Sequence, residues 1–388
     1  MSASNDNPTA TISDHPDCTR LRLGGRRSRG VILIGMSRDA VRVSETDPLL
    51  FAHTLFWESR EICRIVMNLG FDIDVIDFDA PAPADHPPYV GSVTLHHHLL
   101  SLRGDLAPGA MKIMWLTGSH PEVQNAREME RIRSLEARRN CLYEPKRQIA
   151  RATEEAVAFE LADRCVLIGN ETTLVTYPAH LHPKIARCNV SAANVTHIKA
   201  AARLVPPARE FIWFAASSAV HKGLDLLLDL FGTKELPTLH VVGALENEPD
   251  FLNIYDAELN GHPRIRYHGF LRGNDPALAA IFDRCVAVLH PSASEGMSGS
   301  VAHCLEVGLY PIISRATGID LPSGCGRYLE RCSPEEIATA VAEVLSKPET
   351  DLAREIAMLQ EMATGRFSRE AFSRRLWDVF GAWLGPDR

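Results

Sequence analysis

The sequence lacks the usual marks of disulfide-linked, metal-binding and membrane-spanning proteins. Its nine cysteines are odd in number and scattered, and no two form a Cys-x-x-Cys pair, as is typical of reduced cytosolic thiols. No run reaches the roughly 18 apolar residues of a membrane helix, and residues 1–28 have no signal-peptide core. We therefore expect a cytoplasmic protein with a disordered tail over residues 1–28, and we leave open peripheral contact at the inner membrane face.

An excess of positive charge is also missing, because the net charge is -8. The chain as a whole is therefore not expected to bind nucleic acid. Two basic stretches stand out, at 20–29 and at 127–151, and the second is interleaved with glutamates. That interleaving favours a solvated helix face, with a site for a lipid-linked or phosphate-bearing acceptor as the alternative.

What the sequence does contain is a long alternation of strand and helix patterns. Single cores stop growing at roughly 250–300 residues, and this chain has 388, so two domains are expected. Pro206 and Pro207 remove two backbone donors in succession, so we place the domain boundary there. The expected domains are 29–205 and 206–366.

Each half begins with a buried apolar strand and continues as a doubly wound α/β domain. In the first half we expect strands at 31–35, 73–77, 112–117 and 165–169 and helices at 52–69, 122–138 and 147–163. In the second half we expect strands at 211–214, 238–242, 264–268, 285–290 and 311–314 and helices at 222–231 and 298–308.

Two strand-to-helix loops of the second half carry residues suited to a phosphorylated ligand. The first contains Ser217, Ser218 and, at the expected helix start, Lys222. Backbone N–H groups and a helix N-terminus attract anions, and a lysine adds a full charge. The second loop places Glu295 at a strand end, where ligands of open α/β sheets bind, although capping of the next helix is the alternative role for this residue.

The order of these motifs resembles a known family. Three motifs resemble the C-terminal half of retaining glycosyltransferases of family four: Lys222-Gly223-x-Asp225, Pro291-Ser292-x-Ser294-Glu295-Gly296 and Gly308-Leu309-x-Pro311-Ile312-x-Ser314. The segments 53–59, 117–120 and 169–174 resemble the N-terminal half of a bacterial branch of that family. The whole series is far more specific than any one motif.

The resemblance implies a GT-B architecture, in which two doubly wound Rossmann-like domains face each other across a cleft. It implies that residues 367–388 form a helix that crosses back to the first domain. The implied activity is hexosyl transfer with retention, from a nucleotide-sugar donor on the second domain to a glycan, lipid-linked or small-molecule acceptor on the first. The alternative is a catalytically degenerate binding subunit, and the motif order gives no support to an epimerase of the same shape.

The resemblance also implies roles for individual residues. Lys222 would hold the donor diphosphate, Glu295 would contact the donor sugar, and His120 would position the acceptor hydroxyl or the donor sugar. The donor-binding positions are Ser217, Ser218, Leu271, Arg272, Gly296, Met297, Ser298, Gly299, Ser300 and His303. On the acceptor side we expect His53 and Asn170, with helix capping as the alternative role for Asn170.

Three positions depart from the family pattern. Ser217 stands where the family has an arginine, His303 stands where it has a second glutamate, and the usual glycine pair is absent near His53 and Thr54. One positive and one negative charge are thus lost together. We interpret the first two departures as one coupled change that keeps the charge balance of the donor site.

Neither a metal nor a cofactor is expected. His96, His97 and His98 are consecutive, so their rings do not converge on one ion as His-x-x-x-His on a helix does. The family resemblance likewise implies that the diphosphate is bound without a metal.

Overall fold

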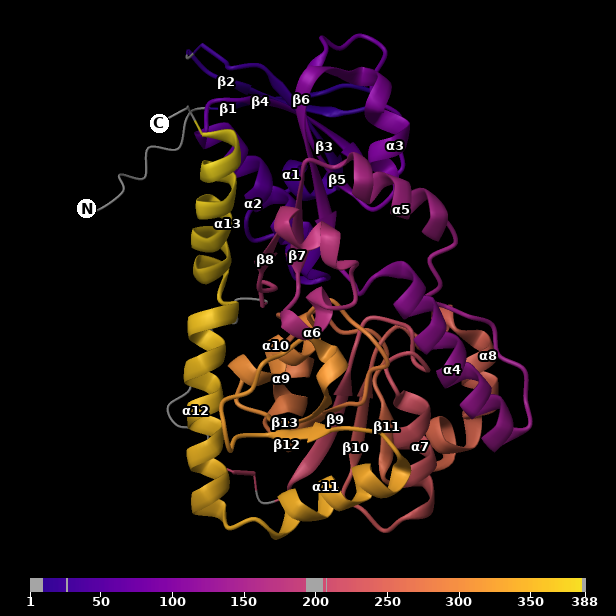
Figure 1. Ribbon diagram of the computed structural model, residues 1–388. Helices are drawn as coiled ribbons and strands as arrows, with labels where there is room; N and C mark the ends of the chain where they lie inside the picture. The colour runs from indigo at the N-terminus through magenta and orange to yellow at the C-terminus, as the bar shows by residue number, and fades with distance from the viewer. Residues whose placement is uncertain (1–9, 26, 193–204, 207, 386–388) are drawn as a thin grey trace.

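Two α/β domains make up the computed structural model, which describes residues 10–25, 27–192, 205–206 and 208–385. Figure 1 shows one domain above the other, with the yellow helices α12 (Glu349–Phe367) and α13 (Arg369–Leu384) along one side of both. The expected domain boundary lies partly outside the described residues, because 204 and 207 are not among them. In the part of the chain that the structure describes, none of the helices combines the length and apolarity needed to cross a bilayer.

The first domain is built on an eight-stranded sheet in the order β1-β2-β4-β3-β5-β6-β7-β8. Neighbouring strands from β4 to β8 pair in parallel, while β1 and β2 are antiparallel at one edge. The elements are β1 (Ala10–Asp14), β2 (Thr19–Leu23), β3 (Val31–Met36), α1 (Asp39–Arg42), η1 (Pro48–Phe51), α2 (Thr54–Asn68), β4 (Asp72–Asp77), β5 (Tyr89–Leu95), α3 (His98–Leu102), η2 (Arg103–Asp105), β6 (Leu106–Leu116), α4 (Pro121–Arg139), α5 (Ala152–Leu161), β7 (Arg164–Ile168), α6 (Glu171–Leu174), η3 (Ala179–Lys184) and β8 (Ile185–Cys188).

Hydrophobic patterning accounts for most of this domain. β3 is apolar along its length because both faces of a parallel sheet are covered, and five of its six residues are buried. α2 begins at His53, whose Nδ1 accepts the Leu55 N–H at 3.1 Å. β5 and β8 were not predicted from the sequence. β5 is interrupted by buried polar residues such as Ser92 and Thr94, which break the apolar run that reveals a strand.

The expected disordered tail over residues 1–28 is wrong for residues 10–23. These residues form the antiparallel pair of β1 and β2, and β2 then pairs with β4. Arg22 donates to the buried Asp74 at 2.6 Å, which fixes β2 against the sheet. The alternation of Leu21 and Leu23 with arginines is therefore the pattern of a half-buried strand. Arg26, from the same basic stretch, lies outside the described residues.

The second domain has six parallel strands in the order β11-β10-β9-β12-β13-β14. β9 and β12 are neighbours, and the connections leave them in opposite directions, so the loops after them meet at a switch point. The elements are β9 (Glu210–Phe214), α7 (Leu224–Thr233), β10 (Leu239–Val242), η4 (Leu245–Asn247), α8 (Pro249–Ile254), η5 (Ala257–Gly261), β11 (Ile265–Tyr267), α9 (Pro276–Phe282), β12 (Cys285–His290), α10 (Gly299–Glu306), β13 (Tyr310–Ser314), η6 (Arg315–Thr317), β14 (Arg327–Leu329) and α11 (Pro334–Ser346).

The C-terminal helices connect the two domains. α12 packs on α10 of the second domain, and α13 packs on α2 and β8 of the first. The chain turns between them at Ser368, whose side chain caps α13 by accepting from the Ala371 N–H. Trp57 of α2 then meets Phe372 of α13 edge to face, with ring centroids 5.6 Å apart.

A second connection explains the basic stretch at 127–151. α4 belongs to the first half of the chain but lies alongside α7 and α8 of the second domain (Figure 1). We call residues 121–147 the strap. The sequence suggested either a solvated helix face or an acceptor site for this basic stretch. Neither describes most of the cations of the strap, because these cations bind residues of the second domain across the domain interface.

Acidic side chains of the second domain receive these cations. Arg138 pairs with Asp225 and Asp229 of α7, and Arg139 pairs with Asp229 and, at 2.7 Å, with Glu258. Lys146 Nζ lies 3.0 Å from Asp250 of α8. Asp225 is fully buried in the docked structure, so its carboxylate depends on the cation that the strap supplies.

Arg138→Ala should therefore lower the free energy of unfolding by roughly 2 kcal/mol, because it leaves the buried Asp225 carboxylate without its partner. Arg133→Ala is the matched control, since Arg133 lies exposed on the same helix. The control should stay within about 0.5 kcal/mol of wild type. Urea denaturation measures both, and equal stability of the two variants would contradict the role given to the strap.

Candidate active site at the domain interface

A cavity of ≈ 240 Å³ lies between the two domains at the switch point. The first domain contributes η1, the start of α2 and residues 190–192. The second contributes Phe214 and Lys222 near β9, three residues after β11, and residues at and just before the start of α10. The three residues after β11 are Phe270, Leu271 and Gly273. The cavity therefore lies beside the carboxyl ends of β9 and β12, where ligands of such sheets bind.

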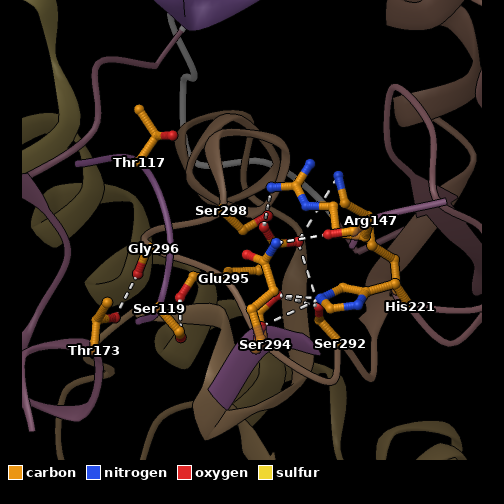
Figure 2. Close-up of polar contacts among 12 residues, drawn as sticks. Thr117, Ser119, Arg147, Thr173, His221, Ser292, Ser294, Glu295, Gly296 and Ser298 are labelled. Carbon is orange, nitrogen blue, oxygen red and sulfur yellow. Dashed lines mark hydrogen bonds and ion pairs between the residues drawn. The ribbon is translucent and has the colours of Figure 1, made fainter. Parts of the chain in front are cut away.

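A buried carboxylate between two cations forms the charged centre of the cavity. Glu295 Oε1 lies 3.8 Å from Lys222 Nζ, and its Oε2 lies 3.7 Å from an Nη of Arg147. Figure 2 shows the Arg147 guanidinium directed toward Glu295. Burial opposes ionisation of Glu295, but Lys222, His290 and Arg147 together hold the pKa of that carboxyl well below its usual value. Burial lowers the pKa of Lys222, and Glu295 opposes that shift.

Hydrogen bonds from the first domain hold the loop between β12 and α10 at the cavity. Ser119 Oγ donates to the Glu295 carbonyl at 3.0 Å, and Thr173 Oγ1 donates to the Gly296 carbonyl at 2.6 Å (Figure 2). A Cβ on Gly296 would lie 2.5 Å from the Thr117 carbonyl oxygen, so only glycine permits this approach. Ser298 then caps α10 by accepting the Val301 N–H, and the first turn of the helix lines the cavity.

The first loop differs from its expected role. The Glu248 carboxylate accepts the N–H groups of Ser218 at 2.5 Å and Ala219 at 3.3 Å, and Tyr143 of the strap donates to it at 2.7 Å. These two N–H groups are therefore already hydrogen-bonded within the protein and are not available to bind a phosphate. Lys222 also precedes α7 instead of starting it, because Gly223 takes a left-handed conformation with φ 74° between them.

Residues 209–347 match the model of the family described as glycosyl transferases group 1. The structure is similar to sucrose-phosphate synthase from Thermosynechococcus elongatus, with 13% identity and a TM-score of 0.63 over 91% of this chain and 98% of that one. The fold is GT-B.

Two other solved structures show the same GT-B likeness. HepE of Anabaena, solved with UDP and glucose, is 12% identical with a TM-score of 0.58 over 91% of this chain and 99% of that one. A trehalose-phosphate synthase from Burkholderia vietnamiensis is 12% identical with a TM-score of 0.53 over 76% of this chain and 74% of that one. No curated protein sequence matches the chain.

The GT-B cleft brings together most of the residues singled out in the sequence. Its lining includes Lys222, Glu295, His53, Leu271, Met297, Ser298, Gly299, Ser300 and His303. Gly299 approaches the first domain so closely that a Cβ there would lie 2.8 Å from Thr54.

Other expected site residues lie elsewhere. His120 begins α4 and packs against Phe159 and Tyr177, both with ring centroids 5.6 Å away, outside the cavity lining. Asn170 caps α6 and donates to Asp320 at 2.7 Å, so its capping alternative is the one that the structure shows. Ser217, Ser218, Gly296 and Arg272 are also absent from the cavity lining.

Two charged residues of the cleft were not recognised from the sequence. Arg147 was counted only as part of a basic stretch, since its approach to Glu295 joins positions far apart in the chain. Glu58 is buried on α2 and accepts from the N–H and hydroxyl of Ser191, each at 3.1 Å. Burial raises the pKa of Glu58 to about 7, with the Ser191 hydrogen bonds opposing that shift.

The three consecutive histidines each have a separate partner. His96 pairs with Glu155 at 2.8 Å, His97 with Asp79 at 3.3 Å, and His98 with the Ala80 carbonyl at 2.8 Å. Across the described ranges of the chain, no group of three potential metal ligands is gathered in one place.

His303 is the buried histidine of the cleft lining, and burial alone lowers its pKa to about 4, so it is neutral at pH 7. The His303 ring packs against Phe214 and Phe282, and its Nε2 is buried without a hydrogen-bond partner among the described residues.

The pH dependence of stability should reveal this burial. Between pH 6.5 and 4 the unfolded chain binds a proton at His303 that the folded chain excludes, so falling pH destabilises the fold. His303→Gln removes this contribution, so its stability relative to wild type should rise by about 2 kcal/mol from pH 7 to pH 5. Urea denaturation at both pH values measures the change. A control, His180→Gln on the surface, should show little change, and a constant difference between His303→Gln and wild type would show that His303 is not protected from protonation.

Proposed function

We propose that the chain is a retaining hexosyltransferase that moves a sugar from a nucleotide-sugar donor to a glycan, lipid-linked or small-molecule acceptor. The observation that carries the proposal is the Lys222–Glu295 pair, buried beside the first turn of α10 inside the region that matches glycosyl transferases group 1. A domain that was only structural would gain nothing from a buried pair facing a cavity, because desolvation of both charges is costly.

The donor diphosphate would lie against Lys222 and the start of α10. A helix N-terminus and a buried ammonium both favour negative charge, and that charge grows on the diphosphate as the sugar departs. Glu295 would accept from a hydroxyl of the donor sugar. In this arrangement the departing phosphate helps to deprotonate the acceptor, so no protein nucleophile is needed, and the cations of the cleft take the place that a metal would fill.

The acceptor would enter from the side of η1 and α2. His53, Thr54 and Glu58 line that wall and offer hydrogen-bonding groups. HepE, which has the same fold, was solved with UDP and glucose, which supports a uridine nucleotide among the donors to be tested. Peripheral contact with a membrane at the inner face belongs to the same proposal if the acceptor is lipid-linked.

A thermal-shift screen against UDP-, GDP-, ADP- and CMP-sugars tests the donor. The true donor at a hundred times its dissociation constant should stabilise the protein by about 2.7 kcal/mol. Release of the nucleoside diphosphate in the presence of an acceptor then tests transfer. Binding without release in a broad acceptor panel would favour the degenerate binding subunit, and no stabilisation by any nucleotide sugar would contradict both functions.

Lys222→Met should weaken donor binding and slow turnover together, because a charge-assisted hydrogen bond to phosphate contributes about 1.5–3 kcal/mol. Methionine keeps most of the buried volume. Lys234→Met, at an exposed position after α7, is the control and should match wild type. Isothermal titration measures donor binding, and initial rates measure turnover. Wild-type turnover in Lys222→Met would show that Lys222 has no role in catalysis.

Glu295→Gln should preserve the fold, since the shape is kept, and should lower kcat by weakening the bond to the sugar hydroxyl. Affinity for the nucleoside diphosphate alone should not fall, because removing the carboxylate leaves Lys222 and Arg147 unopposed. Steady-state rates and nucleotide titration separate the two outcomes. Unchanged kcat would leave Glu295 with a structural role only.

A further inference from the structure

We propose that Arg147, from the first half of the chain, is the second cation that binds the donor diphosphate. The inference rests on the proposed function and assigns to Arg147 the charge that is missing at Ser217. Ser217 is outside the cavity lining, whereas Arg147 is part of it together with Lys222 and Glu295.

The contacts of the Arg147 guanidinium leave it available to a ligand. Its one ion pair among the described residues is with Glu295, at 3.7 Å, and no hydrogen bond of its side chain is found in that part of the chain. The Lys222 ammonium is also beyond a direct hydrogen bond from Glu295, at 3.8 Å. A diphosphate could therefore bind both cations without breaking a short bond of either.

Charge counting shows what Arg147 adds. Lys222 and Glu295 alone cancel, and His303 is neutral at pH 7 because burial lowers its pKa to about 4. Arg369 also lines the cavity, but it stacks on Phe51 and Trp57 and donates to the Leu50 carbonyl at 2.9 Å. Arg147 is thus the cation that gives the cluster of Lys222, Glu295 and Arg147 a net positive charge, as a diphosphate requires.

The backbone of Arg147 is fixed by buried groups of α4. Its N–H donates to Glu128 Oε1 at 2.6 Å, and its carbonyl accepts from Gln124 at 2.7 Å. Both side chains are buried, and the strap that carries them is tied to the second domain by its ion pairs. The side chain therefore has a defined position relative to Lys222, and its planar guanidinium suits two-point binding of phosphate oxygens.

Isothermal titration with UDP, GDP and ADP, and with the matching nucleosides, tests this assignment. Arg147→Gln should weaken binding of the preferred nucleoside diphosphate about 10- to 100-fold, the size of one charge-assisted hydrogen bond, and should leave nucleoside affinity unchanged. Arg147→Lys keeps the charge and should lose less. Arg133→Gln is the control, because it removes the same charge from an exposed position of the strap outside the cavity lining, and it should bind within about twofold of wild type.

Several outcomes would overturn the assignment. They are wild-type diphosphate affinity in Arg147→Gln, equal losses in the glutamine and lysine variants, and a parallel loss of nucleoside affinity, which would indicate a structural role. If Arg147→Gln does not fold, Arg147→Met carries the same expectation. Failure of wild type to bind any of the three diphosphates would instead contradict the proposed function, so the two failures are distinguishable.

Discussion

The loop between β12 and α10 is the element on which the cleft depends, because both domains hold it. Its carbonyls at Glu295 and Gly296 accept hydrogen bonds from Ser119 and Thr173 of the first domain, while its residues continue into a helix of the second. Buried carbonyl groups must be satisfied, so separating the domains would cost these two carbonyls their protein partners. The position of the Glu295 carboxylate is thereby linked to domain docking.

The strap provides the second link, and its ion pairs add to the apolar contacts of Ile132, Leu135 and Tyr143. A buried acid such as Asp225 is costly when alone, so the pairing of α7 with α4 is selective for one docking geometry. Tyr143 also links the strap to the loop between β9 and α7, since it donates to the Glu248 carboxylate that fixes the amides of Ser218 and Ala219. Stability of the interface and shape of the site thus rest on the same contacts.

Local sequence patterns were sufficient for the fold class and for the residues that follow strands. β3 and β12 are continuous apolar runs, and helices such as α2 have the spacing of an amphipathic helix, so their existence could be read directly. Lys222 and Glu295 could be predicted as site residues because both lie after strands that neighbour each other in a doubly wound sheet. The pair β1 and β2 was missed, since β2 is held by pairing with β4, a strand distant in sequence.

The sequence by itself determined two doubly wound domains and the acid and lysine of the cleft, since periodicity and strand-end position are local properties. Only the tertiary structure decided which charges meet. In the tertiary structure His120 contacts Phe159 and Tyr177. The amides of Ser218 and Ala219 donate to Glu248. Arg147 lies across the interface beside Glu295. The physical reason is that Coulomb and hydrogen-bond energies depend on distances in space, and a docked strap sets those distances without leaving a pattern in the residues that it joins.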